Sequence, residues 1–217
     1  MSPRSADPGI RHALVEAAAR LIATEGSPGC TLRRLADEVG TSTMAIYTHF
    51  GGMEEVRSEV TKEAFARLSR HMGAVEVTDD PVADLCLIGW AYFTNATENP
   101  NMYRVMFMER PPSDEAATVA LGTFDQLVAA VRRCIDSGAF DPGDAPSYAT
   151  QLWGLVHGLV TLELAGLLDA GHGVANLIAT VRSLFVGYGM PRDALERSLA
   201  VASERVSGAP ATGGRRR

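Results

Sequence analysis

Residues 31–50, TLRRLADEVGTSTMAIYTHF, constrain the fold of this 217-residue chain more than any other stretch. Thr31 is a suitable N-cap for a helix. Apolar residues follow it at helical spacing: Leu32, Leu35, Ala36 and Val39. Gly40 stands where a left-handed residue would end that helix, and Ser42 can cap a second helix that reaches about Phe50. The pattern predicts a helix-turn-helix, whose second helix can lie in the major groove of DNA.

The predicted second helix has two different sides. Ile46 and Phe50 fall on one side, and Met44, Tyr47 and Thr48 fall on the other. A tyrosine phenol can bind phosphate while its ring lies against a sugar or a thymine methyl group, although Tyr47 could also be a half-buried packing residue. The candidate DNA contacts are Thr31, Arg33, Thr43, Met44, Tyr47, Thr48 and His49. For Thr43, Met44 and Thr48 the alternative is ordinary solvent exposure. Thr31 is expected to cap its helix and could also contact phosphate, and His49 could pack instead.

The charges of this stretch cancel. Arg33 can bind phosphate or guanine, or pair with Asp37 four residues on. For Arg34 we expect the second outcome, an ion pair with Glu38. The net charge of the whole chain is −6, which argues against general coating of nucleic acid and predicts weak non-specific DNA binding.

The rest of the chain predicts helices only, because no segment shows sustained alternation of apolar and polar residues. The predicted helices span residues 8–24, 53–72, 81–97, 101–108, 113–136, 147–169, 174–188 and 191–206. We therefore expect an all-α fold. A three-helix headpiece, 8–68, is joined by the long helix 53–72 to a larger helical domain, 81–206. The ends, 1–6 and 207–217, are expected to be flexible tails.

Composition excludes several classes of protein. Three cysteines lie far apart without a C-x-x-C pair, which is typical of a reducing compartment. The first residues lack the apolar core of a signal peptide, and polar residues interrupt the most apolar helix, so we expect a cytoplasmic protein with no membrane span. The chain contains no G-x-S-x-G, P-loop, G-x-G-x-x-G or H-E-x-x-H motif. We predict neither an enzyme nor a cofactor, and no catalytic or metal site.

The run GTSTMAIYTHF, with the long helix after it, resembles the tetracycline-repressor family of one-component regulators. The telling residues are Gly40, Ser42, Ile46, Tyr47 and Phe50. Further along, WGLVHG at 153–158 and ENPNMYRVMFM at 98–108 are similar to a subgroup of that family named for its Trp, His and Gly. Two positions depart from the family pattern, because Met53 stands where a phosphate-binding lysine is usual and Ala45 where threonine is frequent.

The resemblance implies a homodimer that binds a palindromic double-stranded operator and represses transcription until a small-molecule effector releases it. Activation instead of repression is left open. A second interpretation is a helical small-molecule-binding protein or enzyme that has lost operator binding. The acidic charge and Met53 favour that alternative.

Bulky apolar groups of the second domain form the candidate ligand pocket, which suits an apolar or aromatic effector. They are Trp90, Phe93, Tyr103, Met106, Phe107, Phe124, Val128, Trp153 and His157. The alternative for each is plain core packing. His157, in a nearly wholly apolar helix, needs hydrogen-bond partners, and a tyrosine or a backbone carbonyl could supply one without any ligand. Glu163 lies six residues on, at another face, so no metal site is predicted.

Glycines in the same helix would let another helix approach closely. Together with the apolar stripe of residues 174–188 they predict a dimer interface in which two helices from each subunit form a four-helix bundle. The predicted interface residues are Leu155, Gly158, Leu159, Leu162, Gly166, Leu177, Val181 and Phe185. Packing within one chain is the alternative, and we expect some of these residues to serve both.

Overall fold

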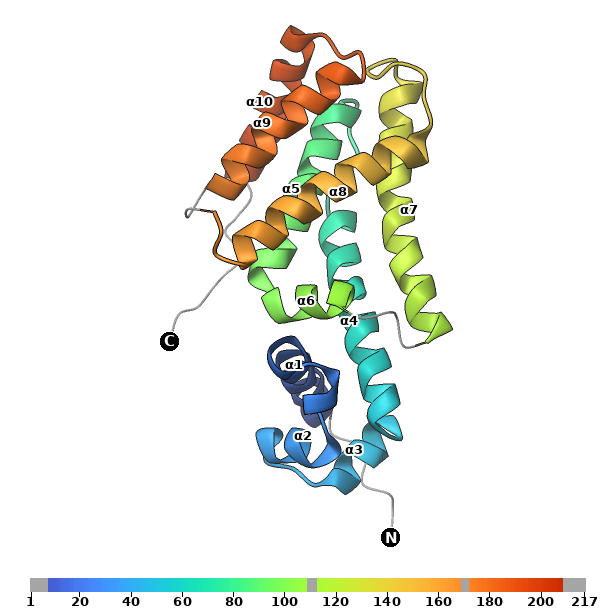
Figure 1. Ribbon diagram of the computed structural model, residues 1–217. Helices are drawn as coiled ribbons and strands as arrows, with labels where there is room; N and C mark the ends of the chain where they lie inside the picture. Colours follow the sequence, from blue (N-terminus) through green and yellow to red (C-terminus); the bar gives the residue numbers. More distant parts are fainter. Residues whose placement is uncertain (1–7, 109–112, 169–171, 209–217) are drawn as a thin grey trace. The chain divides into compact units, whose positions relative to one another are not determined.

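The computed structural model describes residues 8–108, 113–168 and 172–208. Over these residues the chain forms ten α-helices and one short 3-10 helix, and no strand (Figure 1). The all-α prediction is confirmed. The chain divides into two compact units, and each is considered by itself: residues 1–69 with 95–123, and residues 70–94 with 124–217.

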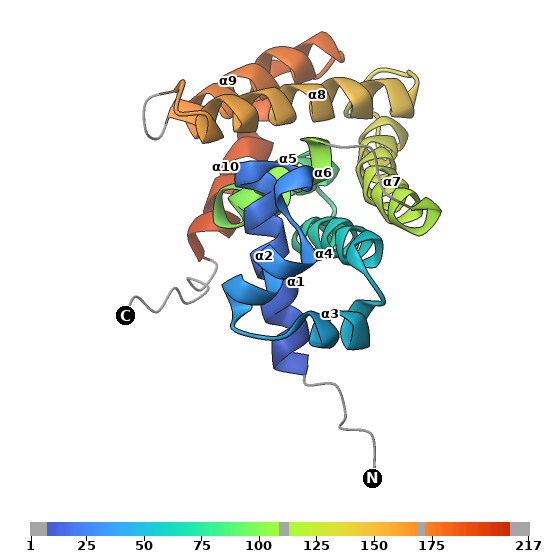
Figure 2. The same cartoon turned by 60° about the horizontal axis from the view of Figure 1, so that its bottom comes forward.

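The first unit holds the predicted helix-turn-helix. Its complete helices are α1 (Pro8–Glu25), the 3-10 helix η1 (Ser27–Gly29), α2 (Leu32–Val39), α3 (Thr43–Phe50) and α6 (Pro100–Met108). Three longer helices contribute to both units: α4 (Met53–Gly73), α5 (Pro81–Glu98) and α7 (Asp114–Asp136). Helix α1 packs against α2 and α6, and α2 packs against α3 (Figure 2).

Aliphatic side chains from four helices make the core of the first unit. The fully buried ones on α1 to α4 are Leu14, Ala18, Leu35, Ile46, Val56, Val60 and Ala64. Those of α4 recur every fourth residue, so that one stripe of the helix faces inward. This stripe buries one face of α4 in the first unit.

The second unit contains α8 (Ala145–Leu164), α9 (His172–Gly187) and α10 (Arg192–Gly208). Helices α8 and α9 lie side by side, and α9 also packs on α10 (Figures 1 and 2). An aromatic group lies at the centre of the core: the ring of Phe140 is 4.9 Å from that of Phe185 and 5.3 Å from that of Tyr188. Val131 and Leu195 are buried in the same cluster.

Helix α8 differs from the predicted span of 147–169. It begins earlier, because the carboxylate of Asp144 accepts a hydrogen bond from the Ser147 N–H at 3.0 Å and so caps the first turn. It ends earlier, at Leu164, because Gly166 takes a left-handed conformation with φ of 69°. The predicted tails 1–6 and 209–217 lie outside the described residues, whereas residues 207 and 208 belong to α10.

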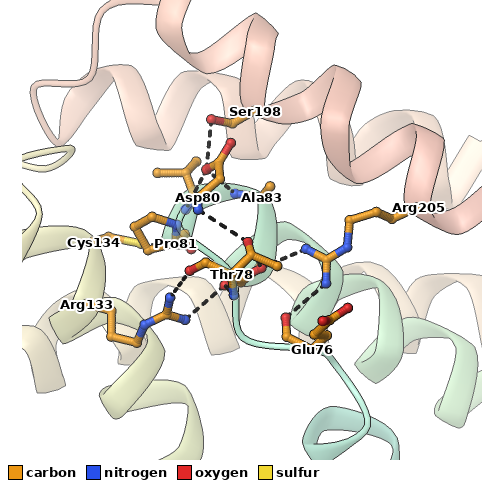
Figure 3. Close-up of polar contacts among 11 residues, drawn as sticks. Glu76, Thr78, Asp80, Pro81, Ala83, Arg133, Cys134, Ser198 and Arg205 are labelled. Atoms are coloured by element: carbon orange, nitrogen blue, oxygen red, sulfur yellow. Dashed lines mark hydrogen bonds and ion pairs between the residues drawn. The ribbon is translucent and has the colours of Figure 1, made fainter.

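The buried carboxylate of Asp84 ties the segment before α5 to two later helices through Thr78, Arg133 and Arg205, which are labelled in Figure 3. The side chain of Asp84 is 2% exposed and accepts four hydrogen bonds. Two come from the N–H and the hydroxyl of Thr78, at 2.8 and 2.9 Å. The others come from Arg133 of α7 at 3.0 Å and Arg205 of α10 at 2.7 Å. We call Thr78, Asp84, Arg133 and Arg205 the Asp84 clamp.

Candidate nucleic-acid interface and effector site

Side chains cap both helices of the helix-turn-helix where the sequence predicts. The hydroxyl of Thr31 accepts a hydrogen bond from the Arg34 N–H at 3.3 Å, and that of Ser42 accepts one from the Ala45 N–H at 3.2 Å. Gly40 has a φ of 69°, and its N–H donates to the carbonyls of Ala36 and Asp37. Only a residue without a β-carbon adopts this conformation cheaply, so the tight turn between α2 and α3 depends on Gly40.

The two sides of α3 have opposite environments. Ile46 is fully buried, whereas Met44 is 69% exposed and Tyr47 48% exposed. Thr43 and Thr48 are also exposed, and the Thr48 hydroxyl donates to the Met44 carbonyl at 2.8 Å. His49 is half-buried, with its ring 6.1 Å from that of Phe50. Helix α3 thus presents a thioether, a phenol and two hydroxyls outward, which are groups that can contact base edges, thymine methyl groups and phosphates.

The arginines of α2 have different surroundings. Arg34 lies 3.1 Å from Glu38 and 3.3 Å from Glu25, which confirms the predicted pairing with Glu38. A hydrogen bond from Arg20 at 2.8 Å also reaches Glu38 and is the main reason why the pKa of this carboxyl lies below its ordinary value. The side chain of Arg33 is 92% exposed, and its contact with Asp37 is long, with 4.0 Å between the nearest nitrogen and oxygen. Arg33 is therefore the α2 arginine that can turn to a phosphate.

Acidic side chains occupy the start of α4, which follows α3 in the chain. Glu54 and Glu55 are exposed, and Glu55 folds back toward Gly52, where a β-carbon would lie 3.1 Å from its Oε2. Met53 precedes them at the position where the resemblance implies a lysine. The edge of the interface beside α3 is thus negative, so a bound phosphate backbone would gain little from it.

The nine residues predicted for the pocket are divided between the two units. Tyr103, Met106 and Phe107 lie in the first, where the ring of Phe107 is 5.1 Å from that of Tyr103. The other six lie in the second unit. There the rings of Trp90 and Phe93 are stacked at 6.3 Å, and those of Phe124 and Trp153 are 5.9 Å apart.

Tyr92 is not among the residues predicted for the pocket, but it links two of them. Its hydroxyl accepts a hydrogen bond from Nε1 of Trp153 at 3.3 Å and lies 3.4 Å from Nδ1 of His157. Burial lowers the pKa of His157, which favours the neutral ring. Of the two partners considered for His157, the structure supplies the tyrosine. The sequence indicated that a histidine in an apolar helix needs a hydrogen-bond partner. It did not indicate which tyrosine supplies one.

The predicted dimer residues fall into two groups. Phe185 is 1% exposed and packs in the core of its own unit, and Leu177 is buried as well. The other six are half-buried or exposed: Leu155, Gly158, Leu159, Leu162, Gly166 and Val181. Ile178 of α9 and Leu162 of α8 are each 39% exposed, so these two helices keep an apolar outward face.

Neither a membrane-spanning helix nor a metal centre was found in the described part of the chain. No helix there is both long and apolar enough to cross a membrane. No three His, Cys, Asp or Glu side chains there are grouped as ligands of one metal ion. Burial raises the pKa of the Cys30 thiol to about 11, so this cysteine is not an activated nucleophile.

Comparisons with known proteins agree with this arrangement. Rv0681 of Mycobacterium tuberculosis, an uncharacterized HTH-type transcriptional regulator, is 29% identical over 163 residues, which cover 73% of this chain and 72% of that protein. The HTH-type transcriptional repressor AcnR of Corynebacterium diphtheriae is 37% identical over 76 residues, 34% of this chain and 40% of that one. The crystal structure of PfmR, a TetR family transcriptional regulator from Thermus thermophilus, has a TM-score of 0.67 at 22% identity and covers 79% of this chain and 96% of its own.

Two family models match the chain at different places. Residues 14–60 match the bacterial regulatory proteins of the tetR family, over α1 to α4. Residues 85–185 match the tetracyclin repressor-like C-terminal domain, over α5 to α9. Together the two matches cover more than half of the sequence, and with the helix-turn-helix geometry they show that this chain belongs to the tetR family of transcriptional regulators.

Proposed function

We propose that this regulator is a repressor that binds a palindromic DNA operator as a homodimer and is released by a small effector. Residues 8–68 would form the DNA-binding domain, and residues 81–206 the ligand-binding and dimerisation domain. The observation that carries the proposal is the outward face of α3, with exposed Met44 and Tyr47 opposite a buried Ile46. The repressor function of AcnR, whose similarity covers about a third of this chain, supports the direction of control. The subgroup named for Trp, His and Gly stays a prediction from sequence.

Helix α3 would enter the major groove, with Tyr47 on phosphate or a thymine methyl group and with Thr43, Met44 and Thr48 at base edges. Arg33 and the hydroxyl of Thr31 would bind phosphates beside it, and His49 would add a contact at the edge. Because Arg34 is held by two glutamates, few positive charges remain for the DNA backbone. Operator binding should therefore depend on salt less steeply than in regulators that make many phosphate contacts.

Dimerisation would use the outward face of α8 and α9. That face carries small and apolar residues at helical spacing, Gly154, Gly158 and Leu162 on α8 and Ile178 on α9. A two-fold axis through a four-helix bundle would place the two α3 helices about 34–36 Å apart, the spacing of successive major grooves.

Effector binding would occur in the second unit, among Trp90, Phe93, Phe124, Val128, Trp153 and His157. Aromatic walls with few polar groups suit a largely apolar molecule. To release DNA, the effector must bind the non-DNA conformation more tightly, and a coupling free energy of about 1–3 kcal/mol is typical.

A mobility-shift titration on the DNA upstream of the chain's own gene tests the proposal. Wild type should bind at moderate salt, and Tyr47→Ala should weaken binding about tenfold or more, because one contact is worth about 1–3 kcal/mol. Arg33→Ala should also lower the slope of log affinity against log salt by about one. Arg34→Ala is the matched control, because Arg34 is already paired with glutamates and should leave that slope unchanged.

Failure of the wild-type protein to shift this DNA at moderate salt would favour the alternative function. In that case the chain would be a helical small-molecule-binding protein or enzyme that has lost operator binding. The acidic start of α4 and the paired Arg34 are the observations that support this alternative.

A further inference from the structure

Helix α8 carries a carboxylate on its inward face. Val156 and Val160 are buried there, and Glu163 comes three residues after Val160, at the same helical phase. Residues three or four apart lie on the same face of a helix. An apolar side chain would therefore be the ordinary residue at position 163. The sequence alone placed Glu163 away from His157, and the burial pattern shows which face it occupies.

The inner oxygen of this carboxylate has no partner. In the part of the chain that the structure describes, Oε2 of Glu163 is buried and accepts no hydrogen bond. It lies against the backbone of Gly173, where an added β-carbon would be 2.5 Å from Oε2 and 3.1 Å from Cζ of Phe93. The carboxylate therefore occupies the space that a side chain at residue 173 would need, and Phe93 borders the same space.

Such an oxygen is costly unless something binds to it. Buried carboxylates in proteins are paired or hydrogen-bonded, because a charged oxygen that loses its water and gains no partner destabilises the fold. The arginines of the second unit whose ion pairs are described lie elsewhere: Arg133 and Arg205 on Asp84, Arg182 on Glu196, and Arg197 on Asp193. An exceptional buried polar atom of this kind needs a physical reason, and a ligand is one.

One aromatic ring borders the same position, and a second ring stacks on the first. Phe93 borders the carboxylate, and the indole of Trp90 stacks on the ring of Phe93 with an interplanar angle of 16°. An apolar wall with one convergent polar group is typical of a small-molecule site, and aromatic faces also attract cations. The ligand group that satisfies an ionised carboxylate beside aromatic rings is an ammonium with N–H donors.

We propose that Glu163 binds a cationic amine on an otherwise apolar effector, with Phe93 and Trp90 against the adjoining carbon atoms. This inference rests on the proposed effector function and specifies its chemistry. It predicts that a long-chain alkyl ammonium is preferred over a neutral alcohol or a carboxylate of equal chain length. A carboxylate ligand would place a second negative charge beside Glu163 and would be repelled.

Tryptophan fluorescence of the full-length protein, without DNA, tests the preference. The probes are n-octylamine, which is protonated at pH 7 as a lysine side chain is, 1-octanol and octanoate. Wild type should bind octylamine at least about tenfold more tightly than either of the others, a difference of about 1.4 kcal/mol. Equal affinity for octanol or octanoate would overturn the proposal.

Glu163→Gln keeps the shape of the side chain and removes its charge. It should lower the affinity for octylamine about tenfold or more and leave that for octanol within about twofold. Glu163→Met should give the same loss, and its melting temperature shows whether the fold is intact. The matched control is Glu204→Gln on the exposed side of α10, which should bind octylamine like wild type. An unchanged octylamine affinity in Glu163→Gln would overturn the proposal.

The mobility-shift assay separates this inference from the proposed function. Octylamine should release wild type from DNA and should release Glu163→Gln only at concentrations about tenfold higher. Release of both proteins at the same octylamine concentration would overturn the assignment of Glu163. Absence of wild-type DNA binding would contradict the repressor function, and the fluorescence titration would still decide whether Glu163 binds an amine.

Discussion

Asp84 and Glu163, two carboxylates of the second unit, differ in how many hydrogen bonds the protein provides. Asp84 accepts four hydrogen bonds and faces two arginines, whereas Oε2 of Glu163 is buried with no donor. Burial disfavours a charged group that has no partner, so the contrast lies in what the protein provides around each buried oxygen. A carboxylate whose bonds are all made within the chain holds helices together. One that is left open is available to a ligand.

The largest effect on stability should follow from removal of the Asp84 carboxylate. Asp84→Ala leaves Arg133 and Arg205 with their charges near a buried site, and removal of one member of a buried pair costs about 3–5 kcal/mol. The melting temperature should fall by about 10 °C. Glu196→Ala is the control, because its ion pair with Arg182 lies at the surface, where solvent screens it, and its loss should lower the melting temperature far less. Equal melting temperatures for the two variants would contradict the structural importance of the clamp.

Acid should remove the contribution of the Asp84 clamp to the free energy of unfolding in a defined pH range. Burial by itself would raise the pKa of Asp84, but the hydrogen bonds from Thr78, Arg205 and Arg133 outweigh it and hold the pKa below its ordinary value. A lowered pKa stabilises the fold above the unfolded-state pKa of about 3.9, and this stabilisation is lost as the pH falls through the folded-state value. Urea unfolding at several pH values measures it.

The difference in unfolding free energy between wild type and Asp84→Asn should be constant above about pH 5 and shrink below about pH 4. Asparagine keeps the shape of the side chain and does not titrate, so it isolates the ionisation of Asp84. A difference that stays constant down to pH 3 would show that the stabilising bonds do not need the charge.

The smallest effect, with the opposite sign, is expected at Glu163. Glu163→Met replaces a buried oxygen that has no partner with an apolar group of similar size, so the free energy of unfolding should rise by about 1 kcal/mol. Chemical denaturation measures the gain, and the loss of octylamine binding in the same variant would show stability traded for function. A clear loss of stability would mean that Glu163 has a structural partner after all, and the contrast with Asp84 would disappear.

Much of the helix-turn-helix follows from residues close together in sequence. The caps at Thr31 and Ser42 act on backbone N–H groups three residues ahead, and the pairing of Arg34 with Glu38 spans one helical turn. Periodicity also predicts the outward position of Met44 and Tyr47. These features need no knowledge of the rest of the chain, because the helix itself brings the partners together. The early end of α8 at Gly166 was readable in the same way, but the apolar run that continues past it favoured a longer helix.

The tertiary structure alone decided the contacts between distant residues. It placed Tyr92 beside His157, and it gathered Arg133 and Arg205 around Asp84, which they follow by 49 and 121 residues. It also put Phe185 inside its own unit and turned Glu163 toward Phe93. A helical pattern tells which face of a helix is inward but not what the face meets. By itself the sequence determined the helices of the headpiece, their caps and the outward face of α3. The packing of those helices decided that Asp84 receives hydrogen bonds and that Oε2 of Glu163 receives none from the described residues.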